Sequence, residues 1–219
     1  MHKDDNIETI LTEENLRKFI AMEKRLLIQD GSLMPRLLVV NGAGERTMIG
    51  LADLPSDSDV KAMMLRAIGL KLRTEHGGIR EALFIAESWM TTSEAPDSDK
   101  IRPSQHPARE EIILIVGRNE ARSRTAFAIQ PFGRDDDGQP IWKEPTITLS
   151  QAQGKLTIDG ILDELFIGAT QLDLPDLEAK RLTLVRSGNS ILGNYHLSFN
   201  RGCFVTNRNV RCSRQLLAV

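Results

Sequence analysis

The sequence predicts an α+β fold: a largely antiparallel meander sheet with two N-terminal helices packed on one face. A C-terminal helix and a basic extension follow. Three observations indicate this fold. Two segments near the N-terminus have apolar residues at helical spacing, several later segments have the composition of strands, and the connections between those strands are short. A soft boundary near Ser150 separates an α+β domain (1–150) from the C-terminal part (151–219), and leaves open whether the second packs on the first.

Residues 12–30 have the signals of the first helix. Thr12 is a suitable N-cap, two glutamates follow it in the first turn, and Gly31 is placed to end the helix. A β-hairpin follows, with strands over 36–40 and 47–52, because Asn-Gly between two β-rich runs is a strong turn signal.

The second helix is expected to begin near Ser56, where serines and aspartates alternate, and to end at Gly77-Gly78. Its apolar residues recur at helical spacing and form one face: Val60, Met63, Met64, Ala67, Ile68 and Leu72.

Strands dominate the next seventy residues or so. A strand over 80–90 is followed by a polar loop over 91–108 and by a strand over 110–116. The strand over 110–116 is apolar on both faces, which predicts a central strand covered on both sides. Further strands are expected over 122–132 and 141–149, with turns at 118–121 and 135–138.

The C-terminal part is expected to start with a helix over 157–169, which has apolar residues along one side. Residues 181–186 and 194–199 could pair as two strands, and the last fifteen residues have no clear periodicity.

Composition excludes several classes of protein. Hydrophobic residues make up 41% and charged residues 26% of the 219 residues, as in an ordinary globular domain. No apolar run approaches the length of a bilayer span, and no apolar stretch follows the N-terminus as in a signal peptide. With two cysteines in the chain, we expect a soluble cytoplasmic protein without disulfides.

The common motifs of nucleotide, metal and nucleophile chemistry are missing from the sequence. Gly42-Ala43-Gly44 lacks the third glycine and the following helix of a dinucleotide fingerprint. Neither the four histidines nor the two cysteines, Cys203 and Cys212, have the spacing of zinc ligands. We therefore expect no metal and no cofactor.

Charge is divided unevenly along the chain. Residues 179–219 carry seven basic and no acidic side chains, whereas the net charge of the whole chain is −2. The segment 180–214 could bind nucleic-acid phosphates, or it could contact an acidic surface of its own chain or of a neighbouring chain. It could also be solvated without a partner. The nucleic-acid candidates are Arg181, Arg186, Arg201, Arg208, Arg211 and Arg214.

Residues 81–111 contain the candidates for a catalytic site. Period-two alternation places Glu87 on the same strand face as large apolar residues, where it would be a partly buried carboxylate if that face is covered. The proline-stiffened loop that follows presents Arg102, His106 and Arg109 beside the strand end. These four residues could form an acid/base or anion site. Alternatively, an arginine from the loop pairs with Glu87 and fixes the loop to the sheet.

The same stretch supports a resemblance. Glu87-Ser88-Trp89-Met90, then Arg102-Pro103-Ser104 and the residues up to Glu111 before an apolar strand, resemble a family of uncharacterised bacterial and phage-associated proteins. Its pattern is an acid-x-Trp-Met strand end before an Arg-Pro-Ser loop. The resemblance covers residues 35–135. It implies no activity or catalytic residue, because the family has none assigned.

These observations favour a non-enzymatic interaction or assembly module that forms homo-oligomers and contacts an acidic surface through its basic C-terminal part. Two alternatives remain open. One is a nucleic-acid-associated protein that uses the basic segment. The other is an acid/base hydrolase centred on Glu87 and His106.

Overall fold

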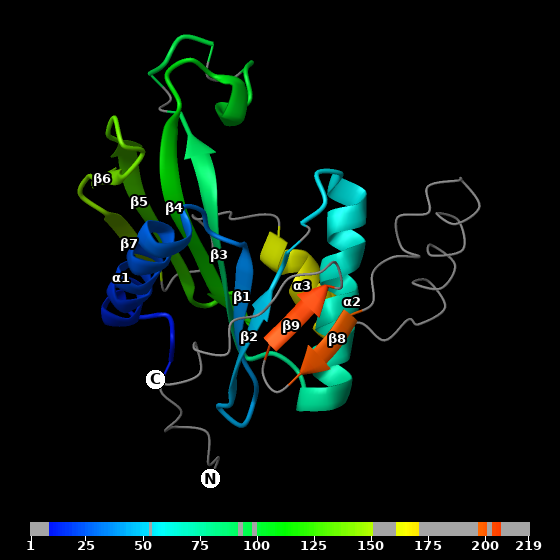
Figure 1. Ribbon diagram of the computed structural model, residues 1–219. Helices are drawn as coiled ribbons and strands as arrows, with labels where there is room; N and C mark the ends of the chain where they lie inside the picture. Colours follow the sequence, from blue (N-terminus) through cyan, green and yellow to red (C-terminus); the bar gives the residue numbers. More distant parts are fainter. Residues whose placement is uncertain are drawn as a thin grey trace.

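The computed structural model describes residues 9–52, 54–91, 94–97, 100–150 and 161–170, together with the backbone of 197–200 and 203–206. The predicted class is confirmed: the fold is α+β with a largely antiparallel sheet (Figure 1). The helices and strands are α1 (Glu13–Asp30), β1 (Arg36–Val40), β2 (Arg46–Gly50), α2 (Ser58–His76), β3 (Glu81–Met90), the 3-10 turn η1 (Pro103–Gln105), β4 (Glu110–Asn119), β5 (Thr125–Arg134), β6 (Pro140–Trp142), β7 (Thr146–Ser150), α3 (Ile161–Thr170), β8 (Leu197–Asn200) and β9 (Cys203–Thr206).

The first two helices have the predicted caps. The side chain of Thr12 accepts a hydrogen bond from the Asn15 backbone N–H, and Gly31 ends α1 in the left-handed conformation, with φ of 75°. Helix α2 begins at Ser58, close to the predicted start near Ser56, because Asp57 caps the N–H groups of the first turn; Gly77 ends it.

The strand order is β6-β5-β4-β3-β1-β2-β9-β8, and β7 also pairs with β5. Neighbours from β1 to β7 are antiparallel, whereas β2 and β9 pair in parallel. The strand expected over 141–149 proves to be two short strands, because the connection between Trp142 and Thr146 contains Pro145, which has no N–H to continue a ladder.

The placement of the two N-terminal helices was predicted wrongly, because they lie on opposite faces of the sheet (Figure 1). On β3, Leu83 and Ile85 pack with α1, whereas Ala82 and Phe84 pack with α2 and α3. Each central strand is apolar on both faces, so each face needs its own cover. The prediction that the strand over 110–116 is covered on both sides is confirmed: Ile115 belongs to the α1 cluster and Val116 to the other.

Helix α3 shares one apolar core with α2 and the sheet. Two glycines make this approach possible. A Cβ on Gly168 would lie 2.0 Å from the Arg66 carbonyl oxygen, and a Cβ on Gly69 would lie 2.0 Å from that of Leu165. Of the predicted helix over 157–169, residues 157–160 lie outside the described residues.

Several C-terminal predictions also lie outside the described residues, including the strand over 181–186. In the strand predicted over 194–199, residues 197–199 belong to β8, which pairs with β9. Among the helices that the structure describes, none combines the length and apolar character needed to cross a membrane.

Candidate functional site

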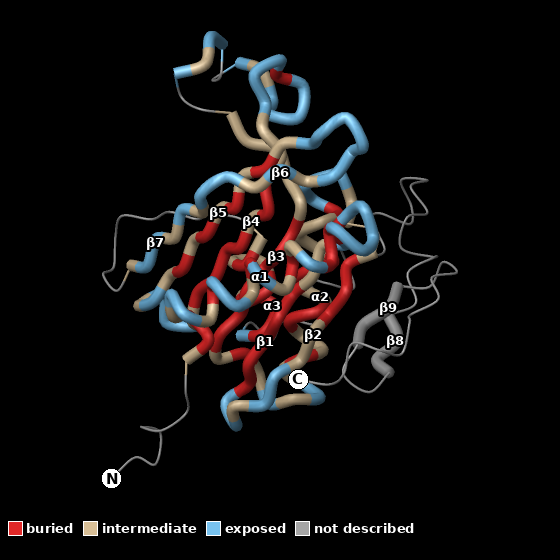
Figure 2. The backbone as a smooth tube through the Cα atoms, turned by 60° about the vertical axis from the view of Figure 1, so that its left-hand side comes forward, coloured by how far each residue is buried: buried red, intermediate tan, exposed pale blue. Residues whose placement is uncertain are grey.

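The second half of β3 and the first half of β4 project beyond the helices and carry the connection between them (Figure 1). We call residues 91–109 the arm loop. Residues 81–86 of β3 are buried, whereas residues 87–90 are half-buried. The arm loop is largely exposed where it is described (Figure 2). All four candidate residues from the sequence lie on this projection.

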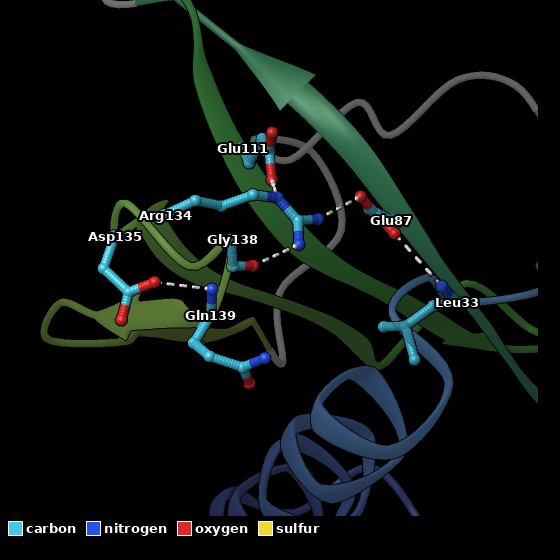
Figure 3. A network of polar contacts seen from close by, with 7 residues as sticks. All are labelled: Leu33, Glu87, Glu111, Arg134, Asp135, Gly138 and Gln139. Carbon is cyan, nitrogen blue, oxygen red and sulfur yellow. Dashed lines mark hydrogen bonds and ion pairs between the residues drawn. The ribbon is translucent and has the colours of Figure 1, made fainter.

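Glu87 is held at the base of the projection by two contacts (Figure 3). One carboxylate oxygen accepts a hydrogen bond from the Leu33 backbone N–H, at 3.0 Å, and so connects the end of α1 to β3. The other lies 3.4 Å from a guanidinium nitrogen of Arg134. The predicted partner, an arginine of the arm loop, was therefore wrong: the cation comes from β5. The three-strand register that brings β5 to Glu87 cannot be read from local sequence.

Arg134 is the centre of this network. Its Nε lies 2.7 Å from a carboxylate oxygen of Glu111, and its Nη1 donates to the Gly138 carbonyl at 3.2 Å. The adjoining turn is held by Asp135, whose carboxylate accepts hydrogen bonds from the Asp137 and Gln139 N–H groups. One cation thus joins β3, β4 and the β5–β6 turn, which indicates a structural role for Glu87.

His106 is only 2% exposed, and its ring connects two parts of the arm loop to each other. Its Nε2 lies 2.7 Å from the Pro96 carbonyl oxygen, and its Nδ1 accepts a hydrogen bond of 3.0 Å from the Ala108 N–H. Because a carbonyl only accepts, the contact with Pro96 assigns a proton to Nε2. Both ring nitrogens are used within the loop.

The two candidate arginines have different surroundings. Arg109 donates to the Ser104 carbonyl at 2.7 Å, and its guanidinium lies 4.5 Å from the centroid of the Trp89 ring. Arg102 precedes η1, its carbonyl accepts from the Gln105 N–H at 2.8 Å, and the residue is exposed. Arg109 therefore packs the loop back onto β3, whereas Arg102 points to the surface as part of the exposed loop.

The fold brings the four candidates onto one projection but does not connect them as an acid/base site. Within the described part of the chain, no hydrogen bond or ion pair joins Glu87 to His106, Arg102 or Arg109. A general base needs an atom within reach of the proton that it takes. Here the polar atoms of Glu87 and His106 serve the fold.

A buried ion pair lies on the same side of the sheet. Glu23 of α1 is fully buried and its carboxylate lies 3.1 Å from a guanidinium nitrogen of Arg36, but without the geometry of a hydrogen bond. Burial raises the pKa of the Glu23 carboxyl, and the charge of Arg36 opposes that rise.

On the opposite side, Arg118 of β4 reaches α3. It lies 2.9 Å from a carboxylate oxygen of Asp163 and 4.2 Å from the ring centroid of Phe166. Burial lowers the pKa of the Arg118 guanidinium, Asp163 raises it and Arg122 lowers it further. This pair fixes α3 to the end of β4.

The six arginines proposed for nucleic-acid binding lie outside the described residues, so their arrangement stays a prediction. In the ranges that the structure describes, no three His, Cys, Asp or Glu side chains gather where they could hold a metal ion. Comparison of the chain with models of protein families, with curated proteins and with solved structures found no match in any of the three. The resemblance to the phage-associated family stays a prediction.

Proposed function

We propose that the chain is a cytoplasmic, non-enzymatic interaction module that self-associates through its arm loop. The observation that carries this proposal is that the described parts of the loop are tied together by their own hydrogen bonds while most of their residues are exposed. Connections of this length without a strand or long helix are uncommon in compact domains and are usually functional or disordered.

The internal contacts of the arm loop favour a functional rather than a disordered loop. The His106 ring ties residues 96 and 108 together, and backbone hydrogen bonds close two turns at Arg102–Gln105 and at His106–Arg109. Internal hydrogen bonds of this kind reduce the conformational entropy that a loop loses when it binds. The arm loop is therefore suited to recognition.

The exposed surface of the loop has the chemistry of a self-complementary contact. Its described, exposed charged residues are of both signs: Glu94, Asp97, Lys100, Arg102 and Arg109. In a two-fold contact the same patch meets itself, so a patch with charges of both signs can place acids of one copy against bases of the other. Within one copy, Asp97 already pairs with Lys100 at 2.8 Å. Trp89 and Arg109, stacked on each other, belong to the residue types that dominate binding energy at interfaces.

The test is the mass of the full chain in solution as a function of its concentration, measured by sedimentation velocity. The unchanged chain should dimerise. Arg109→Ala should weaken the dimer about tenfold or more, because it removes both the Ser104 bond and the stacking on Trp89. His106→Ala should weaken it as well, by loosening the loop.

The matched control is Arg124→Ala. Arg124 is exposed at the β4–β5 turn, at the other end of the same strands, and its loss should leave the dimer unchanged. The proposal would be refuted if the chain stayed monomeric at every concentration, or if Arg109→Ala left the stability of the dimer unchanged.

The charge of residues 179–219 favours nucleic-acid binding as a second candidate function. Its test is binding of DNA or RNA at two salt concentrations, with and without residues 179–219. Neutralisation of phosphates by arginines predicts a strongly salt-dependent affinity that disappears with the segment. An affinity that survives the truncation would exclude this candidate.

The acid/base alternative has its own test, since Glu87→Gln should abolish any hydrolase activity if Glu87 is catalytic.

A further inference from the structure

A cavity of about 530 Å³ lies between α1 and the β6–β7 connection, away from the arm loop. Its size is that of a small-molecule site. Its walls come from three parts of the chain that are distant in sequence, as the neighbouring positions of α1, β5 and β6 suggest (Figure 1). The residues that line it are Arg17, Ile20, Ala21, Lys24, Gln130, Trp142, Lys143, Glu144 and Pro145.

Gln130 gives the cavity a fixed hydrogen-bond acceptor. The residue is 1% exposed, and its amide nitrogen donates to the carbonyls of Pro131 and Lys143, at 2.9 and 2.6 Å. Because both partners are acceptors, the amide cannot be turned round, and its oxygen must point the other way. Among the described residues, nothing donates a hydrogen bond to that oxygen.

The charges around the cavity favour an anion. Three lining side chains are basic and one, Glu144, is acidic. Lys24 is held in place over the Trp142 ring, 4.5 Å from its centroid. Arg17 pairs with Glu13, and Lys143 pairs with Glu110 at 2.7 Å. Lys24 is thus the basic residue of the set that has no described carboxylate partner.

The remaining walls are apolar. Trp142 packs against Phe132, with ring centroids 5.3 Å apart, and so has a fixed position. Ile20 and Pro145 add apolar surface. A ligand that matches these features has a negative group for Lys24 and an N–H donor for the Gln130 oxygen.

We propose that this cavity binds a small organic anion that carries an N–H donor. Two sources have this chemistry: a nucleoside monophosphate, whose base offers N–H groups, and an N-acylated acidic amino acid, whose amide does. The inference is independent of self-association through the arm loop.

Isothermal titration calorimetry on the full chain tests it. The ligands are the common nucleoside monophosphates, N-acetyl-aspartate, uncharged adenosine and inorganic phosphate. At least one of the organic anions should bind about tenfold more tightly than adenosine and than phosphate. Which anion does so distinguishes the two sources.

Variants locate the binding. Ala21→Phe should abolish it, because Ala21 is exposed on α1 and a larger side chain there fills the cavity without entering the core. Lys24→Ala should weaken it about tenfold. Lys18→Ala is the matched control: the residue is exposed on the same helix, pairs with Glu14 and does not line the cavity, so binding should be unchanged.

Three results would overturn the inference. The first is that phosphate binds as tightly as the organic anions, which would show that positive charge alone accounts for the binding. The second is that no ligand binds below about 1 mM. The third is that binding survives Ala21→Phe, which would place it elsewhere on the molecule.

Discussion

The two faces of the sheet differ in how completely they are covered. We call them the α1 face and the α2–α3 face. On the α2–α3 face, two helices approach each other closely at Gly69 and Gly168 and share a continuous apolar core with the strands. On the α1 face, one helix covers the strands, and the polar network around Arg134 occupies the sheet beyond its end (Figure 3).

This difference indicates which face serves stability and which serves binding. Where α2 and α3 pack on the strands, the apolar interior leaves no room for a partner, although a cavity of about 450 Å³ lies at the ends of these two helices. The α1 face retains polar side chains, the cavity beside Trp142 and the base of the projection that carries the arm loop. Both proposals therefore fall on the side with less cover, and the following substitutions test the contrast.

The largest effect is expected on the α2–α3 face. Gly168→Ala would place a methyl group 2.0 Å from the Arg66 carbonyl oxygen, so the two helices must separate. We expect a loss of about 3 kcal/mol in the free energy of unfolding, measured by urea denaturation. Gly133→Ala is the control, since a Cβ there meets nothing within 4 Å. Equal stability of the two variants would contradict the close packing of α2 and α3.

A smaller effect is expected from the network on the α1 face. Arg134→Leu leaves Glu87 and Glu111, both less than a quarter exposed, without their cation. We expect a loss of about 2 kcal/mol in the free energy of unfolding. Lys143→Ala breaks a more exposed pair and should cost less than about 1 kcal/mol.

A double variant sharpens this second prediction. Adding Glu111→Gln to Arg134→Leu removes one uncompensated carboxylate and should restore part of the lost stability. If Arg134→Leu costs no more than Lys143→Ala, Arg134 does not hold the three strands together.

The smallest effect depends on pH and arises from Glu23. Folding raises the pKa of this carboxyl above its ordinary value of 4.5. In the pH window between the ordinary and the raised value, folded chains therefore bind more protons than unfolded chains. Stability from Glu23 is therefore fully present below the window and is lost as pH rises through it. One proton limits the slope to about 1.4 kcal/mol per pH unit.

Glu23→Gln cannot titrate and should lack this loss. The free energies of unfolding of the variant and of the unchanged chain, measured from about pH 4 to about pH 8, should diverge in favour of the variant as pH rises. A constant difference across the range would show that Arg36 compensates fully for burial. Loss of the Arg36 pairing adds an offset that does not depend on pH in this range.

Local sequence signals predicted the elements of the fold well. Thr12, Gly31 and Gly77 act where the sequence placed them, because a cap needs only its own side chain or backbone and the adjacent turn. Alternation along β3 correctly placed Glu87 on the face of Leu83 and Ile85. The apolar character of β4 on both faces correctly predicted that both sides are covered, although the two N-terminal helices were expected on one face.

The candidate site was predicted less well. The sequence singled out Glu87 and His106, and the structure shows what each one contacts, but it gave no reason to connect Glu87 with Arg134, 47 residues away. Gln130 and Trp142 carried no signal as cavity residues, because what distinguishes them is their distance to α1 and to a connection formed by other strands.

The sequence by itself determined where helices and strands begin and end, because hydrogen bonding within a turn and the spacing of apolar residues act over a few neighbours. Only the tertiary structure decided which face each helix covers, which cation meets Glu87 and where a cavity remains. These depend on strand register and on the packing of distant segments, and a short stretch of sequence carries no information about its partners across the sheet.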